Sequence, residues 1–196
     1  MNKVEKIEKC TELFNSLIRP AGDPWGVQGK LDNFFPEFLT PIIGLNFRIL
    51  DIGAGDCLTY EYLKERVQKG ELYWEGINKG GDLETSKAKG YNVKDMDFNF
   101  LEYEDNSFDL LIAVSVLEHS ICPPLMLMEM YRVASKYVFV RFPAINAEGG
   151  ILSYEENPDH HFIMNKAMWE KMFKIVGFSI EKSGLDGGEL QYLLKK

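Results

Sequence analysis

Short apolar runs alternate with amphipathic segments along most of the chain, and each run is long enough for a buried strand. These runs lie at residues 48–51, 72–77, 91–93, 108–116 and 137–142. Helical spacing predicts helices over residues 58–68, 83–89, 123–133 and 166–176. Pro123-Pro124 mark the start of the third helix, Asn165 caps the last one, and Gly177 follows its end. Two final runs, 178–183 and 189–194, flank a glycine turn and predict a hairpin. The pattern predicts an α/β fold: a doubly wound, Rossmann-like, mostly parallel seven-stranded sheet with a C-terminal antiparallel hairpin and helices on both faces.

The region before the first strand has a different pattern. Apolar spacing predicts an amphipathic helix over residues 4–19, a Pro/Gly loop at 20–26 and a short helical stretch at 31–43. We therefore interpret residues 1–196 as one domain, with N-terminal helices and a candidate lid at 1–45 and a Rossmann-like core at 46–196.

Composition and charge narrow the classes of partner. The 196 residues carry a net charge of −8 and contain no dense cluster of Lys and Arg, which argues against a nucleic-acid partner. No apolar window reaches the length of a membrane span, and the first residues lack the apolar core of a signal peptide. Three cysteines without metal-ligand spacing indicate reduced thiols. The expected location is the cytoplasm, away from membranes.

The strand at 48–51 leads into a turn of sequence Gly53-Ala54-Gly55, with Asp51 at its carboxyl end. Open α/β sheets bind ligands at the carboxyl ends of their strands, and glycines let a ligand approach the backbone closely. A dinucleotide fingerprint would have a third glycine where Leu58 stands and an acid where Asn78 stands. Asp51 would repel a pyrophosphate and favours a nucleoside cofactor with a positive centre.

Later motifs make this interpretation more specific. Asp97 precedes a Ser-Phe-Asp triplet that leads the strand at 108–116, Leu-Glu-His follows at 117–119, and Arg132-Val133 precedes the next strand. From about residue 47 to 178, this combined pattern resembles the class I S-adenosylmethionine-dependent methyltransferases, of the small single-domain, methyltransferase type 11-like kind. The resemblance implies S-adenosyl-L-methionine as the cofactor and methyl transfer as the reaction.

The resemblance also implies a set of site residues. The implied cofactor-binding residues are Asp51, Gly53, Ala54, Gly55, Asn78, Asp97, Phe98, Ser115 and Val116. Asp51 would lie near the amino group of the cofactor, and the glycine turn would pass beneath its methionine part. Asn78 would face the ribose, and Asp97 would accept a hydrogen bond from the adenine amino group while Phe98 covers the ring. Ser115 and Val116 would line the methyl end.

Two positions depart from the family pattern. Cys57 replaces the last glycine of the turn, and Asn78 replaces the acid that usually holds the ribose hydroxyls. The loss of one charge-assisted hydrogen bond is worth about 1.5–3 kcal/mol, which corresponds to roughly tenfold or more in affinity. We expect the cofactor to bind nonetheless.

The candidate catalytic residue is His119, which could accept a proton from an oxygen or nitrogen nucleophile. The alternative is a histidine that bonds the backbone and shapes the loop. His160 or His161 could line the substrate pocket, but adjacent histidines in an extended segment point apart, so no metal site is predicted. Trp25 is a candidate lid residue over the substrate, or else packs on the sheet edge.

The sequence thus predicts methyl transfer from S-adenosyl-L-methionine to a small-molecule acceptor. Two alternatives stay open: a catalytically degenerate relative that binds the cofactor or a partner, and a NAD(P)-dependent oxidoreductase. The identity of the acceptor and the oligomeric state do not follow from the sequence.

Overall fold

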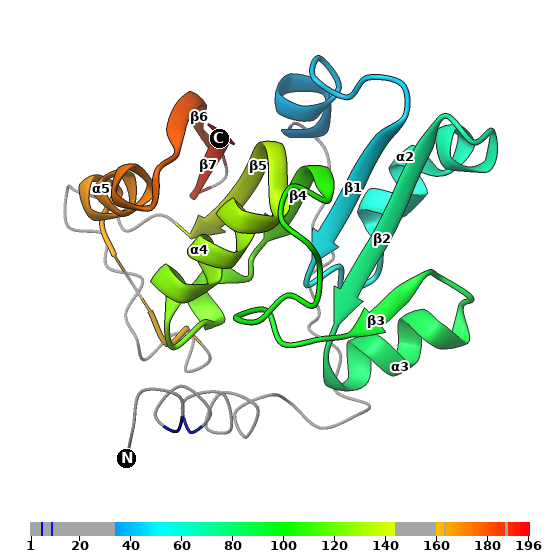
Figure 1. Ribbon diagram of the computed structural model, residues 1–196, viewed down its shortest axis with the longest axis horizontal. Coiled ribbons are helices and arrows are strands. Elements are labelled where there is room, and N and C mark those ends of the chain that lie inside the picture. The colour runs from blue at the N-terminus through cyan, green and yellow to red at the C-terminus, as the bar shows by residue number, and fades with distance from the viewer. Residues whose placement is uncertain (1–4, 6–8, 10–33, 144–159, 163, 187) are drawn as a thin grey trace.

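The computed structural model describes residues 5, 9, 34–143, 160–162, 164–186 and 188–196. The strands of its sheet are β1 (Phe47–Ile52), β2 (Leu72–Asn78), β3 (Val93–Asp95), β4 (Phe108–Val114), β5 (Ala134–Pro143), β6 (Ser179–Asp186) and β7 (Glu189–Lys195). They pair in the order β3-β2-β1-β4-β5-β7-β6. The first five run parallel, and β7 is antiparallel to both β5 and β6 (Figure 1). The predicted seven-stranded sheet with its terminal hairpin is confirmed.

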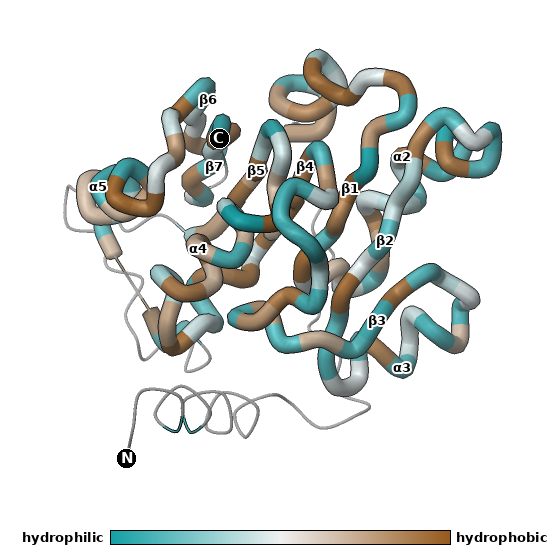
Figure 2. The backbone as a smooth tube through the Cα atoms, in the orientation of Figure 1, coloured by the Kyte–Doolittle hydropathy of each residue, from teal (hydrophilic) through white to brown (hydrophobic). Residues whose placement is uncertain are grey.

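Helices cover both faces of this sheet. They are α2 (Leu58–Gln68), α3 (Gly80–Ala88), α4 (Pro123–Val133), α5 (Lys166–Val176), the π-helix η1 (Phe35–Leu39) and the 3₁₀-helix η2 (Leu117–His119). On one face, buried residues of α4 and α5 such as Met130 and Trp169 pack on the central strands. On the other face, η1 and α2 contribute Phe35 and Leu63. The central strands accordingly contain many of the hydrophobic stretches in Figure 2.

The last helix begins and ends where the sequence predicts. Asn165 lies at the N-cap of α5, and its side-chain oxygen accepts a hydrogen bond of 3.0 Å from the backbone N–H of Met168. Gly177 follows the helix with φ of 118°, a left-handed conformation that glycine adopts without steric cost. These two local signals set both ends of α5.

Two predicted boundaries around the third strand are wrong. The helix predicted at 83–89 begins earlier, at Gly80, and ends at Ala88. The strand predicted at 91–93 instead runs from Val93 to Asp95, because its pairing with β2 places Val93 opposite Gly76. Tyr91 lies before the strand, with its ring against that of Tyr60. Packing between elements therefore sets these boundaries, which apolar spacing alone does not locate.

Of the helix predicted at 4–19, the structure describes residues 5 and 9, both helical, while the loop at 20–26 with Trp25 lies outside the described residues. Of the helical stretch predicted at 31–43, η1 forms residues 35–39, with Pro36 in its first turn, where proline is tolerated. None of the helices in the described part of the chain is both long and apolar enough to span a bilayer.

Candidate functional site

The strand order reverses direction between β1 and β4, which is the topological switch point of the sheet. The chain continues from β1 to β2 on one side, while β4 lies on the other side of β1. Open α/β sheets bind ligands at such a switch point, outside the carboxyl ends of the strands. Asp51 lies near the end of β1, paired in register with Gly76 of β2 and Ile112 of β4. The residues that follow β1, β2 and β4 therefore meet at one edge of the sheet (Figure 1).

Asp51 places a buried carboxylate near the end of β1. Its side chain is 3% exposed, and its Oδ2 atom has no hydrogen-bond partner among the described residues. Burial raises the pKa of this carboxyl to about 7, and the nearby Thr59 and Trp74 side chains offset only part of that rise. A carboxylate in this environment gains stability from any cationic group that reaches it.

The glycine turn after β1 has a left-handed backbone. Gly53 has φ of 65° and Gly55 has φ of 50°. A Cβ atom on Gly53 would lie only 2.6 Å from Cγ2 of Val116, so no other residue fits there without displacement of that side chain. The N–H groups of Gly53 and Ala54 donate to the carbonyl of Ile77, which ties the turn to the end of β2.

Asn78 holds this turn from the neighbouring strand. Its Oδ1 accepts from the N–H of Gly55 at 2.9 Å, and its Nδ2 donates to the carbonyl of Gly55 at 3.0 Å. Nδ2 also lies 2.9 Å from the Ser86 hydroxyl, which itself donates to the Gly55 carbonyl at 2.9 Å. The amide of Asn78 thus pairs with both the N–H and the carbonyl of Gly55. Its expected contact with a ribose stays a prediction.

Cys57 completes the buried contacts around the turn. It has φ of 60°, the conformation for which the family pattern has glycine, and its side chain is fully buried. Its Sγ atom lies 3.4 Å from the Ser86 hydroxyl and 3.7 Å from the carbonyl of Gly55. Burial raises the pKa of this thiol to about 11, so it stays protonated and fills space beside the turn.

A second carboxylate lies after β3. Oδ1 of Asp97 accepts from the backbone N–H and the side chain of Asn99, at 2.8 and 3.1 Å. Its Oδ2 atom is buried and has no partner within the described ranges. Phe98, next along the chain, is buried as well. The bonds to Oδ1 therefore hold the Asp97 side chain in place, while Oδ2 can accept a hydrogen bond from a ligand.

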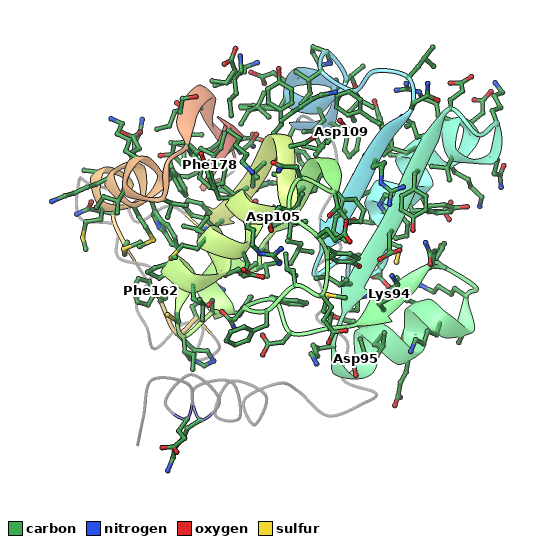
Figure 3. The ribbon with its side chains drawn as sticks, in the orientation of Figure 1. Lys94, Asp95, Asp105, Asp109, Phe162 and Phe178 are labelled. Atoms are coloured by element: carbon green, nitrogen blue, oxygen red, sulfur yellow. The ribbon has the colours of Figure 1, made fainter. Side chains whose placement is uncertain are left out.

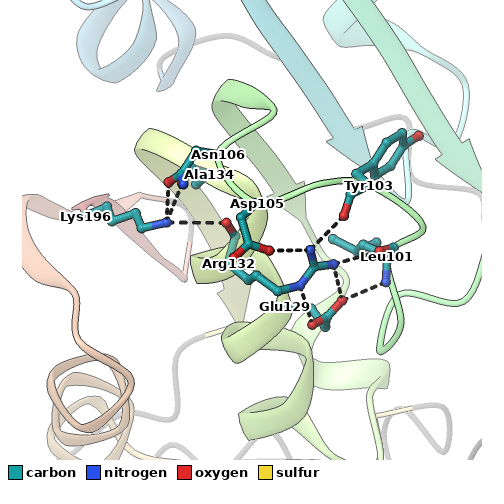
Figure 4. Close-up of polar contacts among 8 residues, drawn as sticks. All are labelled: Leu101, Tyr103, Asp105, Asn106, Glu129, Arg132, Ala134 and Lys196. Carbon is teal, nitrogen blue, oxygen red and sulfur yellow. Dashed lines mark hydrogen bonds and ion pairs between the residues drawn. The ribbon is translucent and has the colours of Figure 1, made fainter.

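The segment that follows Asp97 is fixed to α4 by Arg132. Its guanidinium donates to the carbonyls of Leu101 and Tyr103, each at 2.7 Å, and pairs with Glu129 and Asp105 (Figure 4). The carboxylate of Glu129 in turn accepts from the N–H of Leu101 at 2.9 Å. This network holds the loop between β3 and β4 in one conformation, which the sequence pattern does not reveal.

The residues after β4 bring a third group to the same edge. Ser115 has φ of 53°, and its N–H bonds the carbonyl of Arg141 on β5 at 2.8 Å. His119 ends η2, with its N–H bonded to the carbonyl of Val116. The His119 ring contacts that of His160 in an edge-on arrangement, with centroids 5.0 Å apart.

Glu118 is a residue that motif matching did not single out as part of the site. It is 3% exposed, and both of its carboxylate oxygens lack a hydrogen-bond partner in the described part of the chain. Burial, with a smaller contribution from the charge of Glu189, raises its pKa to about 8. The sequence signal was its place in the Leu-Glu-His triplet, immediately before the candidate base.

Comparisons with known proteins agree with this architecture. A family model described as methionine biosynthesis protein MetW matches residues 37–149. The chain is similar to the complex between the Haloferax volcanii Trm112 methyltransferase activator and a proposed methyltransferase (TM-score 0.68, 13% identity, covering 79% of this chain and 84% of that one). It is also similar to an S-adenosylmethionine-dependent methyltransferase from Mesorhizobium loti (TM-score 0.63, 14% identity, covering 83% of this chain and 97% of that one).

A third similar structure is a magnesium protoporphyrin IX methyltransferase from Synechocystis with bound S-adenosylhomocysteine (TM-score 0.60, 15% identity, covering 78% of this chain and 75% of that one). A search of curated protein sequences finds no match. At these identities the structural likeness shows a shared fold. The antiparallel β7 between β5 and β6 also separates this sheet from the dinucleotide-binding order 3-2-1-4-5-6.

Proposed function

Because the chain belongs to the MetW family and has the fold of S-adenosylmethionine-dependent methyltransferases, we propose that it binds S-adenosylmethionine and transfers the methyl group to a small-molecule acceptor. One observation carries this proposal. Two carboxylates at the same edge of the sheet, Asp51 and Asp97, each keep a buried oxygen without a partner among the described residues. Such atoms are costly to bury unless a ligand satisfies them.

The groups present fit the two ends of this cofactor. Asp51 would hold the ammonium of the methionine part, which restores a favourable environment for its buried charge. Asp97 would accept a hydrogen bond from the exocyclic amino group of adenine, and Phe98 would cover the ring. Gly53 and Gly55 carry no side chains, so the backbone of the turn can approach a ligand closely.

Asn78 has a different role in this proposal from that of the family acid. Its bonds to Gly55 make it a positioning residue that fixes the turn. The Oδ1 atom retains a second lone pair, which could accept one ribose hydroxyl. The site therefore holds the ribose with less charge than a carboxylate would supply, and we expect lowered affinity for the cofactor.

When bound, the sulfonium supplies a methyl group already activated for displacement, so the protein chiefly positions the acceptor and excludes water. An acceptor that arrives protonated must lose its proton, and His119 is the group proposed to take it. If it does, His119→Ala lowers turnover by about 10²–10⁴-fold. Near-normal turnover of this variant with the true acceptor would remove that role.

Calorimetry with S-adenosylmethionine, S-adenosylhomocysteine and NAD⁺ tests the proposal. We expect the first two ligands to bind and the third to give no heat. Asp97→Asn keeps the shape of the side chain but removes its charge, so it should weaken S-adenosylhomocysteine binding by about tenfold. Asp95→Asn, two residues away on β3, is the matched control and should leave the affinity unchanged. Binding of NAD⁺ alone, or of none of the three, would overturn the assignment.

A further inference from the structure

Three side chains that commonly bind metals converge beside the carboxyl end of β4. Glu118 and His119 lie on η2, and His160 comes from a distant part of the chain. One ligand atom from each of the three lies within 4.8 Å of the other two. Nε2 of His119 is 4.0 Å from Oε1 of Glu118, and the His119 and His160 rings are in edge-on contact. The sequence does not reveal this cluster, because His160 lies far along the chain from Glu118 and His119.

The carboxylate of Glu118 supplies an independent indication of a ligand. Both of its oxygens are buried, and neither has a hydrogen-bond partner within the described residues. In the same ranges its one ion-pair contact is with His119 at 4.0 Å, while Arg141 pairs with Glu189 instead. Burial of a carboxylate without hydrogen bonds or a cation carries a desolvation cost that nothing offsets. A cation between these residues would remove that cost.

The backbone holds the third side chain in place. The N–H of Phe162 donates to the carbonyl of Glu118 at 3.1 Å, which fixes residues 160–162 beside η2. Figure 3 shows Phe162 beside the N-terminal end of α4, immediately after η2. His160 is thus held near Glu118 and His119 by a bond between the two segments.

We propose that Glu118, His119 and His160 bind a divalent transition-metal ion of the zinc class. Two imidazoles and one carboxylate suit Zn²⁺ and related ions, whereas Mg²⁺ and Ca²⁺ prefer all-oxygen sites. Ligand atoms on one Zn²⁺ ion lie about 3.3 Å apart, given bonds of about 2.0 Å at tetrahedral angles. The 4.0 Å gap between His119 and Glu118 therefore has to close by less than about 1 Å, which small side-chain rotations achieve.

Three protein ligands leave a coordination position open for water or for a substrate atom. An ion on Nε2 of His119 occupies the lone pair that a base would use, so the base role proposed for His119 applies only to the metal-free protein. The three residues can bind an ion whether or not the protein transfers methyl groups. Metal binding is therefore measured without S-adenosylmethionine, so that a failure of this proposal can be told apart from a failure of the proposed function.

The test uses the full chain without an affinity tag, first stripped with a chelator and then titrated with Co²⁺ by absorption and with Zn²⁺ by calorimetry. We expect one ion per chain and visible Co²⁺ bands. His160→Ala and Glu118→Gln should each weaken Zn²⁺ binding by at least about tenfold. His161→Ala is the matched control and should keep the wild-type affinity for Zn²⁺.

Glu118→Gln also guards against misfolding, because it removes an unpartnered buried charge and should leave the metal-free protein at least as resistant to heat as the wild type. The proposal fails if wild type binds Zn²⁺ no more tightly than His160→Ala, or if His161→Ala loses as much affinity as His160→Ala. Equal affinity for Mg²⁺ and Zn²⁺ would also overturn it.

Discussion

Asp51→Asn should change two properties in opposite directions: it should stabilise the unliganded protein and weaken its binding of the proposed cofactor. The substitution keeps the shape of the side chain and removes a charge that is buried without a partner for Oδ2 among the described residues. Burial raises the pKa of Asp51 from 3.8 to about 7. At about 1.4 kcal/mol per pKa unit, the ionised carboxylate costs the unliganded fold up to about 4 kcal/mol above pH 7.

The sign of the pH dependence follows from this pKa. Between pH 3.8 and about 7 the folded state binds more protons at Asp51 than the unfolded state does. The contribution of Asp51 to folding stability therefore falls as the pH rises through this window. Asp51→Asn should lack this loss and should be the more stable protein at pH 8.5. Burial of the asparagine amide offsets part of the gain.

Urea denaturation of both proteins at pH 5.5 and 8.5 measures this difference, and calorimetry with S-adenosylhomocysteine measures binding alongside it. Wild type should bind the ligand more tightly as the pH rises toward 7.5, because the ligand ammonium requires the ionised carboxylate; Asp51→Asn should lose most of its affinity. Asp56→Asn, an exposed control in the same turn, should change neither property. Identical pH dependence of stability in wild type and Asp51→Asn would refute the reasoning.

Three other substitutions test parts of the site. Gly53→Ala should destabilise the fold by about 1–3 kcal/mol in urea denaturation and weaken S-adenosylhomocysteine binding, because the new Cβ would collide with Val116. Gly70→Ala is the control: this glycine is also left-handed but has open space around it, so the variant should cost only about 1 kcal/mol and leave binding intact. Asn78→Ala should cost about 1–3 kcal/mol in the same assay, since the N–H of Gly55 loses its partner while the carbonyl keeps the Ser86 hydroxyl. Arg132→Leu should lower the melting temperature and weaken nucleoside binding through the loop it holds, and unchanged hydrogen exchange in that loop would contradict this.

Local signals in the sequence were sufficient for most of the fold. Apolar runs located the central strands, and Asn165 and Gly177 located the ends of α5, because capping depends on residues close in the chain. The start of α3 was missed, since Gly80 has weak helix propensity and the helix forms through its packing on β2 and β3. Edge strand β3, with three residues, has little pattern of its own.

The local geometry of the candidate site was predictable where neighbouring residues determine it, as in the glycine turn that follows Asp51. It was not predictable where contacts join distant segments. Asn78 looks like a lost ribose ligand in the sequence, but in the structure its amide bonds Gly55, 23 residues away. His160 meets His119 only through the fold, so its partners in the proposed metal site could not be read from its neighbours.

A crystal structure of the chain with S-adenosylhomocysteine tests the central claim most directly. We predict a nucleoside across the carboxyl ends of β1 to β4, with the ligand ammonium about 3 Å from the carboxylate of Asp51 and the adenine amino group at a similar distance from Oδ2 of Asp97. A ligand bound elsewhere, or no ligand at saturating concentration, would contradict the account.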